Sequence, residues 1–487
     1  MSLNRLVTVA ALALTLVFAA LPMPAARAGG DDCAAMDPLC FDRLPRDDTW
    51  ERAIRLSAVP YWLEGDGVAV ASIDTGVTPN RDLGSRLRAR LDFTSDADGI
   101  DRFGHGTHIA GLIASNGASS ERAYEGAAPE ADLVSLKVAG WDGATDVSTV
   151  IAALQWATSN HARYGIRVVN LSWGTDGAQS ADVDPLDAAV ERAWREGLVV
   201  VVSAGNTAGS VTKPGDDPHV ITVGAADIAG TAAYDDDTVA PFSARGPGAK
   251  PDVVAPGVSL ISDRARGSTI DLFNPAARVG WSLFRGTGTS QAAAIVSGVA
   301  ARMLDANPSL TPDQVKAALM KSTGGRLAGE GGGAGLIDAG LAVASIAPTN
   351  GPESLPSLDG PAPAESTGAG TLDGARGEFA VSGDLDSDGT PEALSGEVDA
   401  LGAPWDPEEF ANTDWTADTW AQSPWAPLVA EIAGSAPAPA RTGPAAPLLA
   451  WDPTYWGAHS PQEAGWDARY WGARYWGARY WGTDAWQ

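Results

Sequence analysis

Hydrophobic residues between positions 50 and 345 fall into two alternating kinds of run. Short runs are apolar at nearly every position, as in "GVAVASID", "ADLVSLKVA", "RVVNLSWG", "LVVVVSAGN" and "HVITVGAAD". Longer Ala-rich stretches with helical spacing separate them, such as "DVSTVIAALQWATSNHA" and "TSQAAAIVSGVAARMLDA". Continuous apolar strands that alternate with helices are typical of a parallel sheet covered on both faces. The pattern predicts one α/β domain over residues 50–345.

The N-terminal residues have the pattern of a secretory signal peptide. An unbroken apolar run extends from Leu6 to Leu21, and Ala26-Arg27-Ala28 follows as a small-residue cleavage site. A membrane anchor is the alternative, but this run is shorter than the roughly 20 residues that span a bilayer. Residues 1–28 are therefore predicted to be removed after Ala28, which makes the mature protein secreted and extracellular, without a transmembrane segment.

Residues 29–49 form a short arm with two cysteines, Cys33 and Cys40. In an oxidising compartment these cysteines are expected to form one local disulfide. A metal site is the weaker interpretation, because the chain has no other cysteine and no histidine lies near them.

Composition changes after residue 345. Residues 346–372 are rich in Pro, Gly, Ser and acids without periodicity, which predicts a linker. A small acidic segment follows over 373–404. Within it Asp384, Asp386 and Asp388 have the spacing of a calcium loop with Gly389 at its sixth position, but Ser395 stands where a bidentate Glu is needed. A solvated acidic turn and a calcium site both remain open.

Residues 405–487 carry an aromatic residue at every fifth position over three stretches, 405–425, 451–456 and 466–486, and the last contains "ARYWGARYWGARYWG". A period of five belongs to neither a helix nor a strand, so we expect a turn-punctuated aromatic array as a low-complexity C-terminal extension. Three interpretations remain open: a flexible tail, a surface that stacks on carbohydrate, cell wall or another polymer, and packing on the catalytic domain or self-association.

The charge of the whole chain excludes one class of partner. With a formal net charge of −28 the protein lacks the basic surface that phosphate contacts require. We therefore expect no nucleic-acid partner, and the acidic surface favours solubility.

Chemistry-bearing residues stand where predicted strands end or helices begin. Asp74 ends "AVASID", His105 precedes an apolar helix in "GHGTHIAG", Ser290 lies in "GTGTSQAAA", and Asn206 ends "VVVVSAGN". A serine between a Gly-rich turn and a helix suits a nucleophile, because glycines admit the substrate and the helix start offers unpaired amides. His105 is predicted to be a general base, and the side-chain amide of Asn206 could donate to an oxyanion.

Two alternatives for these residues are weaker. His105 and His108 could suggest zinc, but the helical zinc motif needs a spacing of four with a Glu between, so His108 is read as a structural residue. Asp74 in Asp-Thr-Gly could belong to an aspartic peptidase, but that needs a second such motif or a short dimeric chain.

The ordered set of motifs resembles the subtilisin-like serine peptidases (subtilases, family S8), over about residues 50–345. "SIDTGV", "GHGTHIAG", "SAGN" and "GTSQAAA" carry the resemblance, and the order Asp, His, Ser is that of subtilisin. It implies a three-layer α/β fold with a mostly parallel central sheet flanked by helices. It also implies a catalytic triad and oxyanion hole, with the substrate-binding segments alongside: Asp74, His105 and Ser290; Asn206; Ser172, Trp173 and Gly174 with Gly140 opposite.

The resemblance implies a secreted serine endopeptidase that cleaves protein or peptide substrates through an acyl-enzyme. Its chemistry needs no cofactor, although structural calcium occurs in the family. Gln291 and Ala294 depart from the usual Met and Pro of the nucleophile helix, and both changes are conservative. The arm over 29–49 is shorter than the inhibitory propeptide that many relatives carry, so we expect maturation to be limited to signal removal and trimming. The alternative function is an inactive surface-binding protein that acts through the Trp-rich tail.

Overall fold

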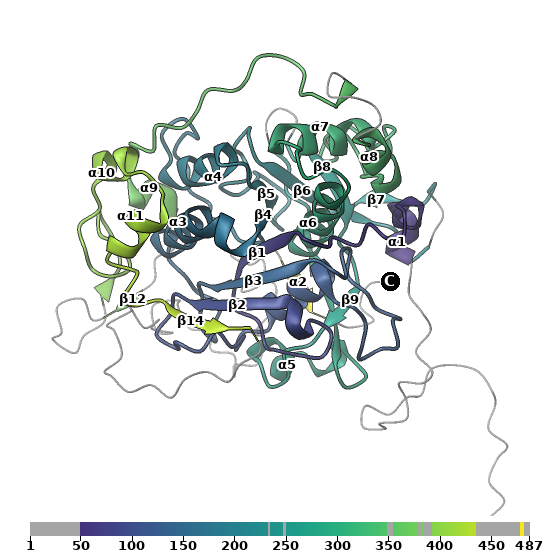
Figure 1. The fold of residues 1–487 in the computed structure, drawn as a ribbon, viewed down its shortest axis with the longest axis horizontal. Helices are drawn as coiled ribbons and strands as arrows, with labels where there is room; N and C mark the ends of the chain where they lie inside the picture. Colours follow the sequence, from purple (N-terminus) through teal and green to yellow (C-terminus); the bar gives the residue numbers. More distant parts are fainter. Residues whose placement is uncertain are drawn as a thin grey trace, which may run out of the picture.

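The computed structural model describes residues 49–231, 234–246, 250–347, 354–377, 382–383, 392–434 and 478–481. A nine-stranded sheet forms the centre of this part of the chain (Figure 1). Its strands run in the order β14-β2-β3-β1-β4-β5-β6-β7, with β8 also paired to β6. Their bounds are β14 Ala430–Ala433, β2 Leu87–Asp92, β3 Asp132–Lys137, β1 Ala69–Asp74, β4 Ile166–Leu171, β5 Val199–Ser203, β6 Ile221–Asp227, β7 Thr238–Val239 and β8 Val253–Pro256.

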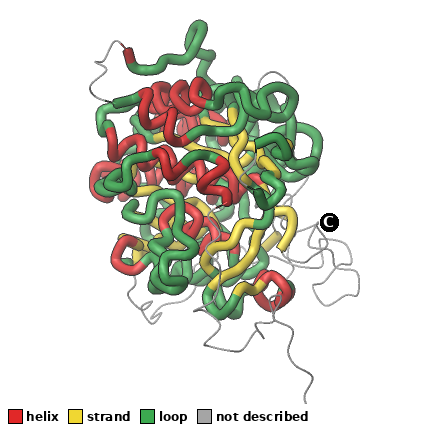
Figure 2. Tube along the Cα trace, turned by 90° about the vertical axis from the view of Figure 1, so that its right-hand side faces the viewer, coloured by secondary structure: helices red, strands yellow, loops and turns green. Residues whose placement is uncertain are grey.

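The inner strands pair in parallel, and only β14 and β7 pair antiparallel to their neighbours. Every residue of β1 and of β5 is buried, which is the burial expected when both faces of a sheet are covered. Helices α2 (His105–Ala114) and α6 (Thr289–Ala306) pack on each other, as do α3 (Val147–Tyr164) and α4 (Pro185–Arg195). The predicted three-layer α/β fold is confirmed, and Figures 1 and 2 show it from two perpendicular directions.

Local sequence signals set the ends of the outer helices. Asp146 caps α3 by accepting a hydrogen bond from the Ser148 N–H, and the helix ends at Gly165, whose φ of 69° is left-handed. Asp184 caps α4 in the same way, with Pro185 at the first helical position. The remaining helices are α1 Thr49–Ala53, α5 Thr269–Phe273, α7 Pro312–Ser322, α8 Ala339–Ser345, α9 Leu372–Arg376, α10 Pro407–Asn412 and α11 Ala417–Gln422, with short 3₁₀ turns at Leu56–Ala58, Gly84–Arg86 and Pro275–Ala277.

A smaller sheet lies beside the central one. Strand β11 (Leu283–Gly288) leads directly into α6 and pairs antiparallel with β9 (Leu260–Asp263), β10 (Arg278–Val279) and β15 (Ala478–Trp481). The last of these strands comes from the distant C-terminal repeat. A separate hairpin joins β12 (Ser382–Gly383) and β13 (Glu392–Ala393).

The described part of the expected linker, residues 354–372, differs from a free connection. Thr367 N–H donates to the Asp182 carbonyl at 2.8 Å, and Ser366 N–H donates to Glu191 Oε2 at the same distance. The linker was predicted because residues 346–372 lack apolar periodicity. The observed contacts are made by backbone groups, which every residue type carries and which composition therefore cannot reveal. Arg376, just beyond, forms a buried ion pair with Asp146 at 2.7 Å.

The first aromatic pentads also fold onto the main domain. Trp420 and Trp425 are 8% and 7% exposed, and both rings lie against Phe93, with centroids 6.1 and 6.3 Å from it. The Arg192 guanidinium stacks over the rings of Phe410 and Trp415. These contacts place α11 next to α3 and Phe410 of α10 against Arg192 of α4, at the left of Figure 1. Of the three interpretations of the repeat, packing on the domain describes this first stretch.

Candidate active site

Three strands deliver the predicted residues to one edge of the central sheet. Asp74 is the last residue of β1, Ser172 follows β4 directly, and Asn206 follows β5. Because parallel strands point the same way, their carboxyl ends meet at a single edge, where open α/β sheets bind ligands. The candidate site is therefore built at the carboxyl edge of β1, β4 and β5.

Asp74 and His105 form a buried pair. His105 Nδ1 lies 2.8 Å from Asp74 Oδ1 and 3.0 Å from Oδ2, and the two side chains are 1% and 0% exposed. The next residue in α2 must be glycine, since a Cβ at Gly106 would lie 2.2 Å from the Gly76 carbonyl oxygen. This close approach of α2 to the end of β1 puts the imidazole against the carboxylate.

A second carboxylate, which the sequence reading missed, supports this pair. Asp101 accepts hydrogen bonds from Thr75 Oγ1 at 2.8 Å, Gly104 N at 2.6 Å and Thr107 N at 2.8 Å. Thr75 Oγ1 in turn accepts from the Gly106 N–H at 2.9 Å. Burial raises the pKa of Asp101, and its hydrogen-bond donors oppose that rise. Its place four residues before His105 at a helix start was the available signal.

Ser290 is the second residue of α6, and its side chain is fully buried. Its Oγ donates to the Ser172 carbonyl at 3.2 Å, and Ser172 Oγ donates to the Ser290 carbonyl at 3.3 Å. Helices α2 and α6, which carry His105 and Ser290, pack directly on each other. The described structure thus gathers the acid, the base and the hydroxyl at one edge.

The side chain of Asn206 is oriented by the residue before the serine. Its Oδ1 accepts from the Thr289 N–H at 2.9 Å and from Thr289 Oγ1 at 3.0 Å. Since a backbone N–H can only donate, the atom facing it must be the amide oxygen, which assigns the NH₂ end of the side chain. That NH₂ group is the donor that this residue can offer to an oxyanion.

The predicted substrate-binding segment is tightly enclosed. A Cβ on Gly174 would lie 2.5 Å from the Lys213 carbonyl oxygen, and neighbouring Thr175 exchanges backbone hydrogen bonds with Lys213. Trp173 is 1% exposed, and its indole packs in the main core. Gly140 is half-buried, and the nearest atom to a Cβ there would be Asp142 Oδ1 at 3.6 Å.

His108 lies one turn beyond His105 and is fully buried. Burial, with a smaller contribution from the neighbouring His105, lowers the pKa of His108 to about 3. This histidine is therefore neutral at physiological pH. Other predicted residues lie outside the described residues: the signal peptide 1–28, Cys33 and Cys40, and the acidic loop with Asp384, Asp386 and Asp388.

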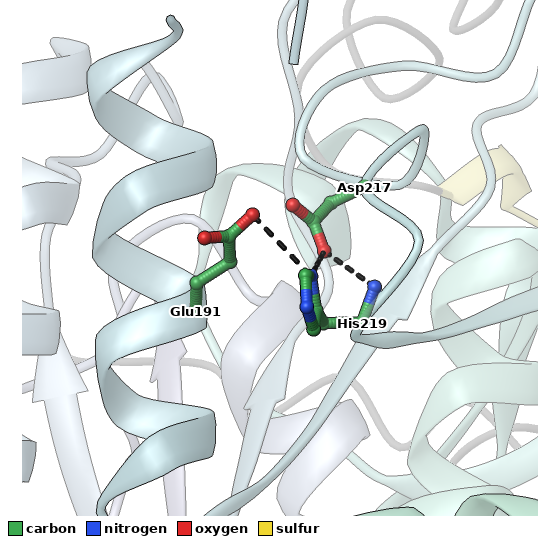
Figure 3. A group of neighbouring side chains, drawn as sticks. All are labelled: Glu191, Asp217 and His219. Atoms are coloured by element: carbon green, nitrogen blue, oxygen red, sulfur yellow. Dashed lines mark hydrogen bonds and ion pairs between the residues drawn. The ribbon is translucent and has the colours of Figure 1, made fainter. Parts of the chain in front are cut away.

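Within the described ranges, one group of side chains has the spacing of a metal site. The carboxylates of Glu191 and Asp217 turn toward the His219 ring, whose Nδ1 lies 3.3 and 3.5 Å from them (Figure 3). Hydrogen bonds that the imidazole donates to the Asp217 and Glu191 carboxylates raise the pKa of His219 to about 9. A protonated imidazole cannot ligate a metal, and its charge already offsets the carboxylates. We read this group as a buried ion cluster that sequence analysis did not find.

Comparison with known proteins gives the family. The subtilase family model matches residues 65–370, more than half of the chain, so the protein belongs to that family. Serine protease AprX of Bacillus subtilis is 43% identical over 274 residues, which cover 54% of this chain and 62% of AprX. Subtilisin Savinase of Lederbergia lenta is 35% identical over 256 residues, 52% of this chain and 82% of Savinase.

A solved structure agrees with the fold. The structure titled as proteases from Pseudoalteromonas arctica matches with a TM-score of 0.51 and 26% identity, over 62% of this chain and 99% of that one. The match to AprX spans less than two thirds of that relative's length. Among helices in the described ranges, none combines the length and the apolarity needed to cross a membrane.

Proposed function

We propose that this protein is a secreted serine endopeptidase whose triad is Asp74, His105 and Ser290. The observation that carries the proposal is the buried Asp74–His105 pair, 2.8 Å apart, with Ser290 on the helix that packs against the histidine's helix. Subtilase family membership and relatives named as serine proteases support the same chemistry. The catalytic domain in this proposal is residues 50–345.

The mechanism follows from what each group can do. Asp74 accepts the Nδ1–H of His105, which fixes the tautomer that leaves Nε2 as the base. His105 removes the Ser290 proton as Oγ attacks the peptide carbonyl carbon. The Asp74 carboxylate stabilises the His105 imidazolium that results. His105 then returns the proton to the departing amine. Water, activated by the same imidazole, hydrolyses the acyl-enzyme and regenerates Ser290.

Negative charge on the tetrahedral intermediate needs donors that are already in place. The NH₂ group of Asn206, oriented by Thr289, and the Ser290 backbone N–H at the start of α6 are the donors we assign to this oxyanion hole. The chemistry uses amino-acid side chains and water, and members of this family need no cofactor for it.

The substrates are proteins or peptides bound in extended form. Ser172, Trp173 and Gly174 would pair with the substrate backbone on one side, and the Gly140 segment would form the other side. We place the activity outside the cell on the strength of the predicted signal peptide. Contact of the Trp-rich tail with cell wall or carbohydrate remains a prediction of the sequence.

Covalent labelling tests the proposal directly. A fluorophosphonate should label the purified wild type and leave Ser290→Ala unlabelled, with peptide hydrolysis falling about a million-fold in that variant. Asp74→Asn should keep the fold and lose about 10⁴-fold in kcat. Asn206→Ala should lose 100- to 1000-fold in kcat while still being labelled, by removing one oxyanion donor. A folded wild type that resists the label would overturn the peptidase assignment.

A further inference from the structure

The proposed substrate site has two edges, the Ser172–Gly174 segment and the Gly140 segment, and both continue into residues that contact α9. Thr175 follows the first edge directly. Asp146 caps α3 at the end of the loop that contains Gly140. Helix α9 packs beside α3 and α4, at the left of Figure 1. One short helix of the C-terminal extension therefore meets the continuation of both edges.

The first edge is joined to α9 through Thr175 and the glycine two residues further on. Thr175 Oγ1 donates to the Ala375 carbonyl at 2.6 Å, and Thr175 is only 4% exposed. A Cβ on Gly177 would lie 2.6 Å from the Gly374 carbonyl oxygen and 2.8 Å from that of Ala375. Two backbones approach this closely only where glycine leaves the space. The Thr175 hydroxyl is thus bonded to α9 and shielded from a bound substrate.

The loop that follows this edge adds contacts at the other end of α9. Gln179 Nε2 donates to the Thr371 carbonyl at 3.0 Å, and Gln179 Oε1 accepts from the Thr371 N–H at 3.2 Å. A Cβ on Gly374 would lie 2.6 Å from the same Oε1. The loop from Thr175 to Gln179 therefore follows α9 from its N-cap, Thr371, to its last turn.

The second edge is joined to α9 through Arg376. Its Nε lies 2.7 Å from Asp146 Oδ2, and both side chains are buried. The same guanidinium donates to the Gly396 carbonyl at 2.7 Å and to the Val398 carbonyl. A planar guanidinium with acceptors on several sides has few alternative orientations. This contact fixes α9 relative to the start of α3.

Helix α9 lies beyond the part of the chain that the subtilase model matches. That match covers residues 65–370, and α9 begins at Leu372. Both edges of the proposed substrate site belong to the matched domain, whereas the helix that joins them belongs to the extension. The connection between the edges is therefore an addition that the C-terminal extension makes to the catalytic domain.

We propose that α9 is a clamp that holds the two edges of the substrate site at a fixed separation, with Thr175 and Arg376 as its positioning residues. The proposal rests on the serine peptidase function proposed above. An extended peptide pairs with both edges at once, so its binding requires that they keep this separation. Loosening the clamp lowers the fraction of molecules that can bind the peptide, and KM rises by the same factor. The chemistry at Ser290 is unchanged once the peptide is bound, so kcat is retained.

The variant Thr175→Val tests the clamp in the full chain, because it removes the hydroxyl that bonds to α9 and nearly keeps the side-chain shape. We expect KM to rise about ten-fold, with kcat unchanged, for an internally quenched peptide long enough to pair with both edges. Hydrolysis of p-nitrophenyl acetate, which needs the triad and no strand pairing, should keep its wild-type rate.

A second variant, Arg376→Ala, breaks the contact with the other edge. It should raise KM for the long peptide in the same way, measured at a temperature where its melting curve shows that it is folded. Because both contacts act through α9, the double variant should raise KM by less than the product of the two single effects. A KM equal to that product would show two independent effects and contradict a shared clamp.

The variant Trp425→Ala is the matched control. It loosens the extension where Trp425 packs on Phe93, and it leaves the contacts of α9 with Thr175 and Asp146 in place. The clamp predicts a wild-type KM for this variant. If its KM rises as much as that of Thr175→Val, general loosening of the extension explains the effect and the clamp is overturned.

Fluorophosphonate labelling separates the two proposals. Wild type, Thr175→Val and Arg376→Ala should all be labelled at the same rate. Equal labelling with an unchanged KM for the long peptide in both variants would overturn the clamp while leaving the peptidase assignment intact. If none of the folded proteins reacts with the label, the peptidase assignment itself fails.

Discussion

The C-terminal extension adds a strand to the molecule in two places, and the two attachments differ. Strand β14 pairs with β2 at the outer edge of the central sheet, with Ile432 buried to 3% exposure and Trp420 and Trp425 packed on Phe93. Strand β15 pairs with β11 next to the proposed nucleophile. The first attachment joins a hydrophobic core, and the second is a main-chain pairing with the strand that leads into α6.

This difference suggests a division of roles. A contact that buries large aromatic side chains rarely opens, because exposing them to water again costs several kcal/mol of free energy. Main-chain pairing at a strand edge is easier to exchange for another peptide. We therefore expect β14 to contribute more to the stability of the fold than β15 does. The predictions below test this contrast, and all stability measurements use the Ser290→Ala background so that autolysis does not interfere.

The largest effect is expected where the extension is anchored by a buried ion pair. Arg376 and Asp146 are 3% and 2% exposed at the side chain, and their atoms Nε and Oδ2 are 2.7 Å apart. Arg376→Ala leaves the Asp146 carboxylate buried without its main counter-charge, and should lower the free energy of unfolding by about 3 to 5 kcal/mol in urea denaturation. Arg195→Ala is the control, because its pair with Glu365 is exposed and should be worth less than about 1 kcal/mol.

Removing an aromatic anchor should come next. Trp425→Ala leaves a cavity against Phe93 and is expected to cost about 3 kcal/mol. Deletion of residues 478–487 should lower the melting temperature less than Trp425→Ala does, since the described attachment of β15 is its main-chain pairing with β11. Differential scanning calorimetry of both variants measures the contrast. A deletion that destabilised as much as Trp425→Ala would make β15 a structural strand and remove the distinction.

The free energy of unfolding should depend on pH because of the buried ion cluster of Glu191, Asp217 and His219, which contacts the 354–377 segment through Glu191. The pKa of His219 is raised from 6.5 to about 9 by Asp217 and Glu191, and Glu191 also accepts the Ser366 N–H. A raised pKa means that the folded state binds the proton more tightly, so this stabilisation is complete below pH 6.5 and is lost as pH rises to about 9.

We expect a loss on the order of 2 kcal/mol across that window, measured by urea denaturation at a series of pH values. His219→Gln should flatten the profile between pH 6.5 and 9. The control His161→Gln changes a histidine outside this cluster and should keep the wild-type slope. A wild-type profile that is already flat there would contradict the assigned cluster.

The smallest effect is expected at the exposed side of β14. Glu431 pairs with Arg163 at 3.3 Å, and these side chains are 43% and 65% exposed. Glu431→Gln should change the free energy of unfolding by less than about 1 kcal/mol, because solvent screens such pairs. Ile432→Ala, on the same strand but facing the core, should cost clearly more. Equal effects from the two changes would indicate that β14 is not held by its buried face.

Much of the fold was predictable because its signals are local. The apolar runs ending at Asp74 and Asn206 indicated parallel strands, and the Gly-rich turns before His105 and Ser290 indicated helix starts. Asp101 was not predicted although its place just before the helix of His105 was a signal, and the cluster of Glu191, Asp217 and His219 was not predicted because Glu191 meets the other two only in the folded chain. The prediction of a free linker over residues 354–372 differs from the structure for a related reason. The backbone hydrogen bonds to Asp182 and Glu191 cannot be predicted from amino-acid composition.

The sequence by itself determined the elements and the order of the candidate triad, through hydrophobic period, capping residues and motifs that act over a few positions. Tertiary structure decided which of these elements meet. It joined Trp420 and Trp425 to Phe93, and it paired a repeat near the C-terminus with the strand before Ser290. A pentad repeat specifies its own spacing but not its partner, because a strand edge is recognised by backbone groups that every residue except proline shares.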